Sequence, residues 1–323
     1  MNTTFKAICI ALAIQAVPAA SAADFGIIDQ STIADNDKFS ISMFTGMLHN
    51  TSKELVYYPD GQRLSQLDWK TKVAPIIGGS FNMRLNERLS WRIDAWTRLL
   101  SGNNEMHDTD WRARDNAYPY WTDRSVHPDT DLKRAFGFDT RVAYRFATYD
   151  SFSLEALAGY RFKKLRWEGR NGSFVYSSFD PADKPGYVYI RDLHGRFQGL
   201  GIRYAQWWQT PYLGISGKFD IKRVTITAEL IGSAWATGRA NDTHLFRDYQ
   251  SSVHGPRTKM VGVSIRADYP IYQNWNVFAK FDYEAYDVVK GTTRGVEKGE
   301  YITSDAGLAN RSKVLDIGVE YRF

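Results

Sequence analysis

Two short acidic segments carry residue types that could activate a water molecule. Asp108 and Asp110 lie two positions apart, and so do Asp242 and His244. Residues at i and i+2 of a strand share a face, so each pair should project from one side of its strand. A carboxylate beside an imidazole orients the ring and stabilises its protonated form, which makes the histidine a better general base. The carboxylate pair, if it faced that ring, could hold and polarise the water.

Neither segment is specific by itself. Asp-x-Asp also occurs as a solvated acidic turn or a loose calcium contact, and Asp-x-His also occurs as a surface ion pair. The chain has no His-Glu-x-x-His and no Gly-x-Ser-x-Gly, which disfavours a zinc protease and a serine enzyme with a nucleophile elbow. We interpret the other histidines as structural or solvated: His49, His107, His127, His194 and His254.

The N-terminus has the order of features that a secretory signal requires. Lys6 precedes an apolar run, and a small-x-small cleavage site follows at Ala20-Ser21-Ala22. A short cytosolic helix is the alternative, but we predict a signal peptide over residues 1–22. Its removal would also remove Cys9, the only cysteine, so disulfides and thiolate metal sites are not expected. The net charge of +5 is too small to indicate nucleic-acid binding.

The elements that would position the acidic pairs are expected to be strands. Apolar residues recur at every second position in segments 224–230, 261–269, 277–285 and 315–323, which is the period of a strand. The last segment ends on an aromatic residue, Phe323, as bacterial outer-membrane barrels do. An edge strand of a soluble sandwich also alternates, but a secreted chain with a strand at its very end favours a closed barrel.

Connections alternate in length along the chain. Short turns are expected at 59–61, 86–88, 147–150, 219–222 and 269–272, and long polar loops at 103–128, 169–197, 240–256 and 287–308. This arrangement predicts an all-β fold, a ten-stranded antiparallel transmembrane β-barrel formed by residues 23–323 as one domain. Strands of up to about 20 residues exceed the 9 to 11 that cross a bilayer, so the barrel should extend beyond the outer membrane. The barrel would also explain a mean hydropathy of -0.42 together with 15% aromatic residues.

Several ordered motifs at matching spacing cover essentially the whole chain after the signal. They are Ser65-Gln66-Leu67-Asp68-Trp69-Lys70, Asp108-Thr109-Asp110-Trp111, Trp121-Thr122-Asp123, His127-Pro128-Asp129-Thr130, Tyr176-Ser177-Ser178, Pro211-Tyr212-Leu213-Gly214 and Asn241-Asp242-Thr243-His244. With them the chain resembles the omptins, a family of outer-membrane proteases with a ten-stranded barrel.

The resemblance implies an active groove at the outer mouth of the barrel. Asp108 and Asp110 would hold the nucleophilic water and Asp242 and His244 would form the base pair, with no metal and no organic cofactor. Because a neutral imidazole must accept the proton, we expect activity to be lost at acidic pH as His244 protonates.

Substrate selection is also implied by the resemblance. Glu54 matches an acid of the pocket for a basic residue before the scissile bond, and Asp123 matches an acid that binds the residue after it. The second pocket acid is replaced by Ala240. We therefore expect a preference for basic residues that is weakened or altered.

Omptins also require lipopolysaccharide, and this implies a basic site on the outer barrel wall. The matching residues are Tyr160, Lys164 and Arg166, with Lys163 and Arg170 nearby. A solvated charge run is the alternative. Lys164 stands where the family has arginine, which loses the bidentate fork for phosphate, and Trp207 stands where another basic residue is usual.

The sequence as a whole predicts a bacterial outer-membrane endopeptidase, monomeric, with its active site facing the exterior. Its partners would be polypeptides with basic residues and lipopolysaccharide, and no nucleic acid. The alternative is a non-enzymatic barrel that acts as an adhesin or a passive pore.

Overall fold

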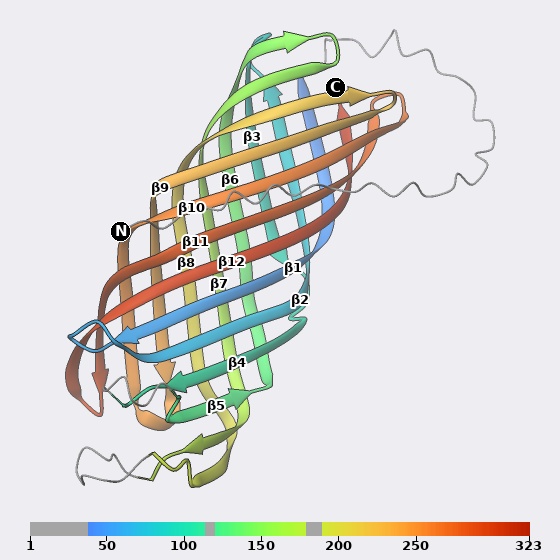
Figure 1. Ribbon diagram of the computed structural model, residues 1–323. Helices are drawn as coiled ribbons and strands as arrows, with labels where there is room; N and C mark the ends of the chain where they lie inside the picture. The colour runs from blue at the N-terminus through green and yellow to red at the C-terminus, as the bar shows by residue number, and fades with distance from the viewer. Residues whose placement is uncertain (1–37, 114–119, 179–188) are drawn as a thin grey trace. The chain divides into compact units, whose positions relative to one another are not determined.

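Long antiparallel strands form nearly all of the structure and wrap around a common axis (Figure 1). The computed structural model describes residues 38–113, 120–178 and 189–323, so the predicted signal peptide lies outside the described residues. No helix in these ranges has the length and apolar content needed to cross a membrane. The elements are β1 (Phe39–Tyr57), β2 (Arg63–Arg84), β3 (Leu89–Arg98), β4 (Asn103–Asp110), β5 (Asp123–His127), β6 (Asp129–Tyr149), β7 (Phe152–Tyr176), β8 (Leu193–Ile221), β9 (Val224–His244), the 3-10 helix η3 (Leu245–Arg247), β10 (Tyr249–Tyr272), β11 (Trp275–Glu297) and β12 (Glu300–Arg322).

The first and last strands close the ring. β1 pairs with β12 from Ser40 opposite Arg322 to Tyr57 opposite Asp305. Phe39 and Phe323 exchange two backbone hydrogen bonds of 3.0 Å, so the pairing includes the final residue. Because of this closure, neither the first nor the last strand is an edge of the sheet. The predicted barrel, closed through its C-terminal strand, is confirmed.

Twelve strand segments make ten strands around the ring. β2 pairs with both β3 and β4, and β7 pairs with both β5 and β6, so each of these couples is one interrupted strand. The first interruption contains Gly102, whose φ of +72° suits glycine, and a Cβ there would lie 2.0 Å from the Val73 carbonyl oxygen. The second contains Pro128, which has no backbone N–H for the ladder. The predicted count of ten is confirmed.

The alternation in sequence places apolar side chains outside and polar ones inside. On β12, Leu315 is 57%, Ile317 62% and Val319 41% exposed, whereas the intervening Asp316 is 3% and Glu320 5% exposed. A soluble sandwich would bury the apolar face instead. The inverted pattern therefore excludes the sandwich alternative and gives the barrel an apolar outer surface.

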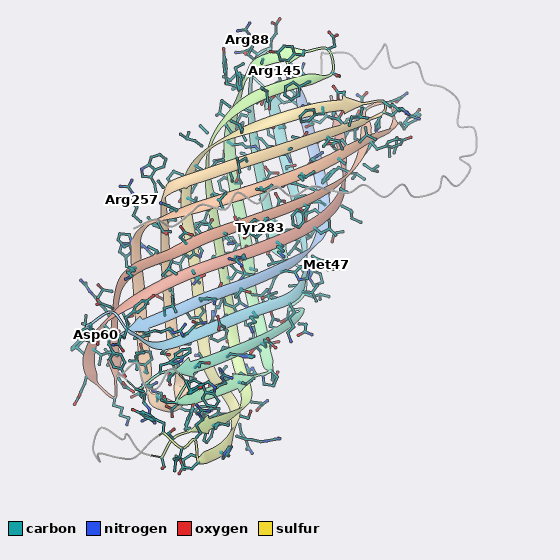
Figure 2. The ribbon with its side chains drawn as sticks, in the orientation of Figure 1. Met47, Asp60, Arg88, Arg145, Arg257 and Tyr283 are labelled. Atoms are coloured by element: carbon teal, nitrogen blue, oxygen red, sulfur yellow. The ribbon has the colours of Figure 1, made fainter. Side chains whose placement is uncertain are left out.

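The turns and loops at the two ends of the barrel are not distributed as the sequence predicts. The turn at 59–61 is expected among the short turns of one end, but Asp60 lies at the opposite end of the barrel from Arg88 and Arg145 (Figure 2). Segments 240–256 and 287–308, expected as loops, are mostly paired strand, and β8 reaches 29 residues. Where a barrel wall is polar on both faces, apolar and polar residues no longer alternate in the sequence. Such a segment is then predicted as a loop although its backbone continues to pair with the neighbouring strands.

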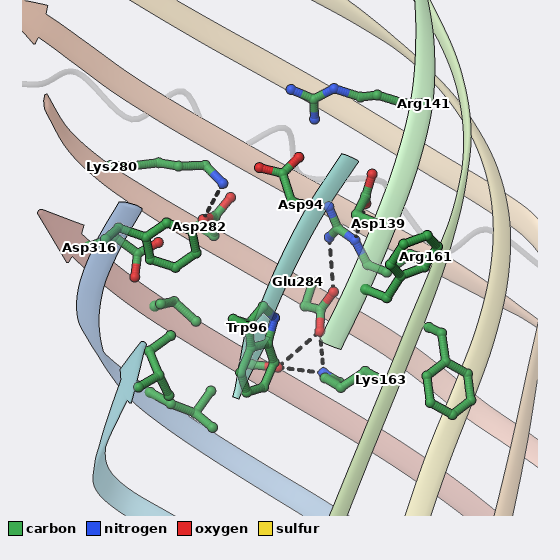
Figure 3. A pocket seen from close by; sticks show the side chains of 17 residues that line it. Asp94, Trp96, Asp139, Arg141, Arg161, Lys163, Lys280, Asp282, Glu284 and Asp316 are labelled. Atoms are coloured by element: carbon green, nitrogen blue, oxygen red, sulfur yellow. Dashed lines mark hydrogen bonds and ion pairs between the residues drawn. The ribbon is translucent and has the colours of Figure 1, made fainter. Parts of the chain in front are cut away.

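Charged side chains bridge the barrel interior between strands that are not neighbours (Figure 3). Arg161 of β7 lies 3.0 Å from Glu284 of β11, and Lys163 binds the same glutamate. Arg141 of β6 lies 2.7 Å from Glu229 of β9. Inward-facing polar residues are thus satisfied by partners across the lumen, as buried charges require.

Removing one partner of such a buried network should destabilise the barrel strongly. Arg266 lies 2.6 Å from Asp268 and 2.7 Å from Glu320, and all three are buried. We expect Arg266→Leu to cost about 3 kcal/mol or more in urea unfolding of the refolded protein, because Asp268 loses its cation and Glu320 keeps only Arg322. Lys72→Met, which removes an exposed pair with Glu105, is the control and should cost below about 1 kcal/mol. Equal effects would contradict this assignment.

Candidate active site

The aspartate pair lies at the end of β4, on the side that faces the barrel interior. Asp108 stands opposite Leu67 and Asp110 opposite Ser65 on β2. Ser65 Oγ donates to Asp108 Oδ1 at 3.2 Å and is close enough to Asp110 to favour its ionised form. One hydroxyl that reaches both carboxylates shows that they share a face, as their spacing predicts. Ser65 begins one of the motifs that resemble the omptins, but nothing in the sequence indicates that it contacts the aspartate pair.

Asp242 and His244 form a direct pair at the end of β9. His244 Nε2 lies 2.7 Å from Asp242 Oδ2, and both side chains are buried. The ring of Tyr249, directly opposite His244 on β10, meets the imidazole edge to face at 5.3 Å. The predicted sharing of one strand face is confirmed, and the tyrosine restricts the orientation of the ring.

The two pairs come from opposite sides of the ring and act on one another electrostatically. Burial raises the pKa of Asp108, with the cation of His244 opposing the rise and the Asp242 charge adding to it. Burial raises the pKa of Asp110 to about 8, and the Asp108 charge contributes. The four residues therefore belong to one coupled site, in which carboxylates outnumber the single imidazole.

His244 has the opposite balance. Burial by itself would lower the pKa of the imidazole, but the charge and hydrogen bond of Asp242 outweigh it and raise the pKa to about 9. With this pKa the ring is protonated at neutral pH. A base with this pKa becomes available only as pH rises.

Two buried carboxylate oxygens beside the imidazole have no hydrogen-bond partner. Within the described residues, these are Glu54 Oε2 and Asp242 Oδ1. Burial raises the pKa of Glu54 to about 8, and the Asp242 charge adds to this. Ala240 is fully buried and stands opposite Gln206 on β8. Unsatisfied buried acceptors of this kind are suited to a cationic ligand group.

Comparison of the sequence with known proteins points to one family. The profile described as the Omptin family matches residues 35–323. This chain belongs to the omptin family. It is 30% identical over 293 residues to the plasminogen activator of Yersinia pestis, covering 89% of this chain and 90% of that protein. It is also 30% identical over 295 residues to outer membrane protease OmpP of Escherichia coli, at 89% and 91% coverage. The crystal structure of outer membrane protease OmpT from Escherichia coli superposes with a TM-score of 0.81 at 28% identity, covering 91% of this chain and all of that one.

In this omptin Asp123 is already engaged. Arg112 Nε lies 2.7 Å from Asp123 Oδ2, and the Ser177 backbone N–H donates to Oδ1 at 3.0 Å. The carboxylate thus anchors the rim between β4, β5 and the end of β7. Its predicted role in binding the residue after the cut remains a prediction, since that role would require displacing Arg112.

The basic residues predicted for lipopolysaccharide divide between two faces of β7. Tyr160 is exposed, Lys164 Nζ lies 4.8 Å over the Trp207 ring and Arg166 is partly exposed, so these three face outward. Lys163 points into the lumen, where it binds Glu284, because neighbouring residues of a strand alternate in direction. The prediction that Lys163 lies with the basic residues of the outer wall is wrong.

No group of three His, Cys, Asp or Glu side chains is placed to hold a metal ion in the part of this omptin that the structure describes. Of the remaining histidines, His127 is buried and stacks on Phe197 at 5.4 Å, in keeping with a structural role. Tyr204, directly opposite Asp242 on β8, is a site residue that sequence reasoning missed. No motif singles it out, because its importance arises from its register.

The pKa of His244 should depend on its carboxylate partner. In Asp242→Asn the effect of burial would be unopposed by that charge, so we expect the pKa to fall from about 9 to below the ordinary 6.5. Histidine-labelled protein in micelles, titrated by NMR, measures this directly. A pKa that stays above 8 in the variant would show that Asp242 is not the source of the rise.

Proposed function

We propose that this omptin is an outer-membrane endopeptidase that hydrolyses peptide bonds near basic residues, with water as nucleophile. The observation that carries the proposal is the coupled arrangement of Asp108, Asp110, Asp242 and His244 at one end of the barrel. The protease names of its relatives support the same reaction class. The paired aspartates and the aspartate–histidine pair supply the groups that a water-activating mechanism needs.

In the proposed reaction, Asp108 and Asp110 hold a water between the two pairs. Neutral His244 accepts a proton from this water as its oxygen attacks the peptide carbonyl carbon. Asp242 then stabilises the imidazolium that forms, which is the ordinary role of a carboxylate behind a catalytic histidine. Collapse of the tetrahedral intermediate breaks the C–N bond, and His244 returns the proton to the leaving amine.

Glu54 would select the substrate. Its Oε2 is buried without a partner and the Asp242 charge acts on the same carboxyl group, so a lysine or arginine side chain that reached Glu54 would gain a charge-assisted hydrogen bond. Such a cation would also favour the ionised form of Glu54, reversing the effect of burial on its pKa. With Ala240 at the second acidic position, the pocket supplies one carboxylate rather than two.

The apolar outer surface and the basic wall support placement in an outer membrane that contains lipopolysaccharide. Strands of 21 to 29 residues from β6 to β9 would extend well beyond the bilayer and place the active site on the exterior side. Lys164, Arg166, Arg170 and Arg203 outnumber Glu168 on this part of the wall, which suits phosphate groups. The enclosed site is complete in one chain, consistent with a monomer.

Substitution of the base pair should abolish cleavage without unfolding the barrel. Protein refolded with lipopolysaccharide should cleave a dibasic peptide, and Asp242→Ala or His244→Ala should each lower kcat by roughly 10²- to 10⁴-fold. His49→Ala, on an outward-facing position of β1, is the matched control and should retain full activity. An inert wild type that binds host matrix would favour an adhesin, and steady conductance in planar bilayers would favour a pore. The ion pairs across the lumen disfavour the pore.

Restoring the second acid should strengthen the basic preference. We expect Ala240→Asp to raise kcat/KM for an arginine peptide over its alanine counterpart by about tenfold or more, because a charge-assisted hydrogen bond contributes roughly 1.5–3 kcal/mol. Ala240→Asn introduces a side chain of the same size as aspartate without its charge. It controls for packing and should not raise this ratio. Equal cleavage of the two peptides by wild-type protein would show that Glu54 confers no selectivity.

A further inference from the structure

A chain of buried hydrogen bonds leads from the barrel interior to Glu54. Its members are inward-facing residues of β8 and β12, namely Tyr204, Gln206, Trp208 and Asn310, and all four are almost fully buried. Gln206 forms four contacts at its amide, so both of its donors and its acceptor oxygen are used. A fully satisfied amide of this kind has one orientation only.

Two groups that can only donate set the direction of the chain. The Trp208 indole N–H lies 3.0 Å from Gln206 Oε1, which must be the oxygen because an indole cannot accept. At the other end, the Lys163 ammonium lies 2.6 Å from Asn310 Oδ1, so the Asn310 amide nitrogen faces Gln206 Oε1 at 3.3 Å. Both ends therefore direct the Gln206 amide nitrogen toward Tyr204 and the Lys53 carbonyl, at 3.1 Å each.

The Tyr204 hydroxyl accepts from Gln206 and must donate elsewhere. Gln206 also donates to the carbonyl of Lys53, the residue before Glu54, and the Tyr204 hydroxyl lowers the pKa of Glu54, so the Glu54 carboxylate is the acceptor that Tyr204 requires. The Tyr204 ring itself is fixed, since it stacks on the buried Trp69 with the ring centroids 5.2 Å apart and an angle of 3° between the ring planes. Tyr204 thus holds the Glu54 carboxylate while Oε2 stays buried and unpartnered.

We propose that Tyr204 and Gln206 are positioning residues for substrate selection, which hold the Glu54 carboxylate in the orientation that receives the cationic side chain before the scissile bond. The inference rests on the proposed peptidase function. It adds that selectivity depends on the direction of a hydrogen-bond chain as well as on the charge of Glu54. Ala240 makes this dependence stronger, since no second acid at that position can compensate for a misplaced Glu54.

The test compares an arginine peptide with the same peptide containing citrulline, which has the shape of arginine without its charge. Tyr204→Phe and Gln206→Met should each lower the arginine-to-citrulline ratio of kcat/KM by about tenfold, through KM rather than kcat. Thr210→Val is the matched control. It also removes a buried hydrogen bond of β8, from Thr210 to Tyr286, but this bond is not part of the hydrogen-bond chain that leads to Glu54. It should leave the ratio unchanged.

Gln206→Glu tests the direction itself. A carboxylate at this position has no donor, so Tyr204 would donate to it and release Glu54, and the ratio should fall as in Tyr204→Phe. The double variant Tyr204→Phe/Gln206→Glu should show no further fall in the arginine-to-citrulline ratio, since both substitutions break the same hydrogen bond from Tyr204 to Glu54. An unchanged ratio in folded variants, or equal losses for both peptides, would overturn the positioning role. A wild type that cleaves neither peptide would instead refute the proposed function on which it rests.

Discussion

Closure of the strand ring is the constraint on which the rest of the structure depends. Once β1 pairs with β12, every second side chain points into a narrow lumen, and the polar ones must find partners there. Arg161, Glu284 and Lys163 satisfy one another across the interior. The same closure brings the ends of β4 and β9, far apart in sequence, to one mouth. The ring therefore both stabilises the fold and assembles the site.

The site departs from this rule of pairing. Four carboxylates, those of Glu54, Asp108, Asp110 and Asp242, gather around one imidazole, and two of their buried oxygens, Glu54 Oε2 and Asp242 Oδ1, have no partner in the described structure. Burial and mutual repulsion raise the pKa values of Glu54 and Asp110, while Asp242 raises that of His244. A cationic side chain and a polarised water would relieve this excess of negative charge, so the free energy that the repulsion costs the protein would favour substrate binding.

Much of this arrangement could be predicted from the sequence, for reasons that differ by residue. Two-residue spacing was enough to place Asp242 with His244, and alternation was enough to find β12. Alternation did not reveal strands that are polar on both faces, so parts of β9 to β12 were expected as loops. The inward direction of Lys163 follows from strand alternation, but its neighbours suggested a continuous basic patch. Tyr204 and Gln206 depend on cross-strand register, which a single sequence does not contain.

The pH dependence of kcat/KM for an arginine peptide tests the central claim most directly, namely that neutral His244, held by Asp242, accepts the proton of the attacking water. The pKa of His244 is raised to about 9, so the reactive neutral form grows as pH rises through that value. The account predicts a rate that increases steadily from acidic pH and still rises between pH 7 and 9. A profile that is flat between pH 5 and 8, or that falls above pH 7, would contradict it.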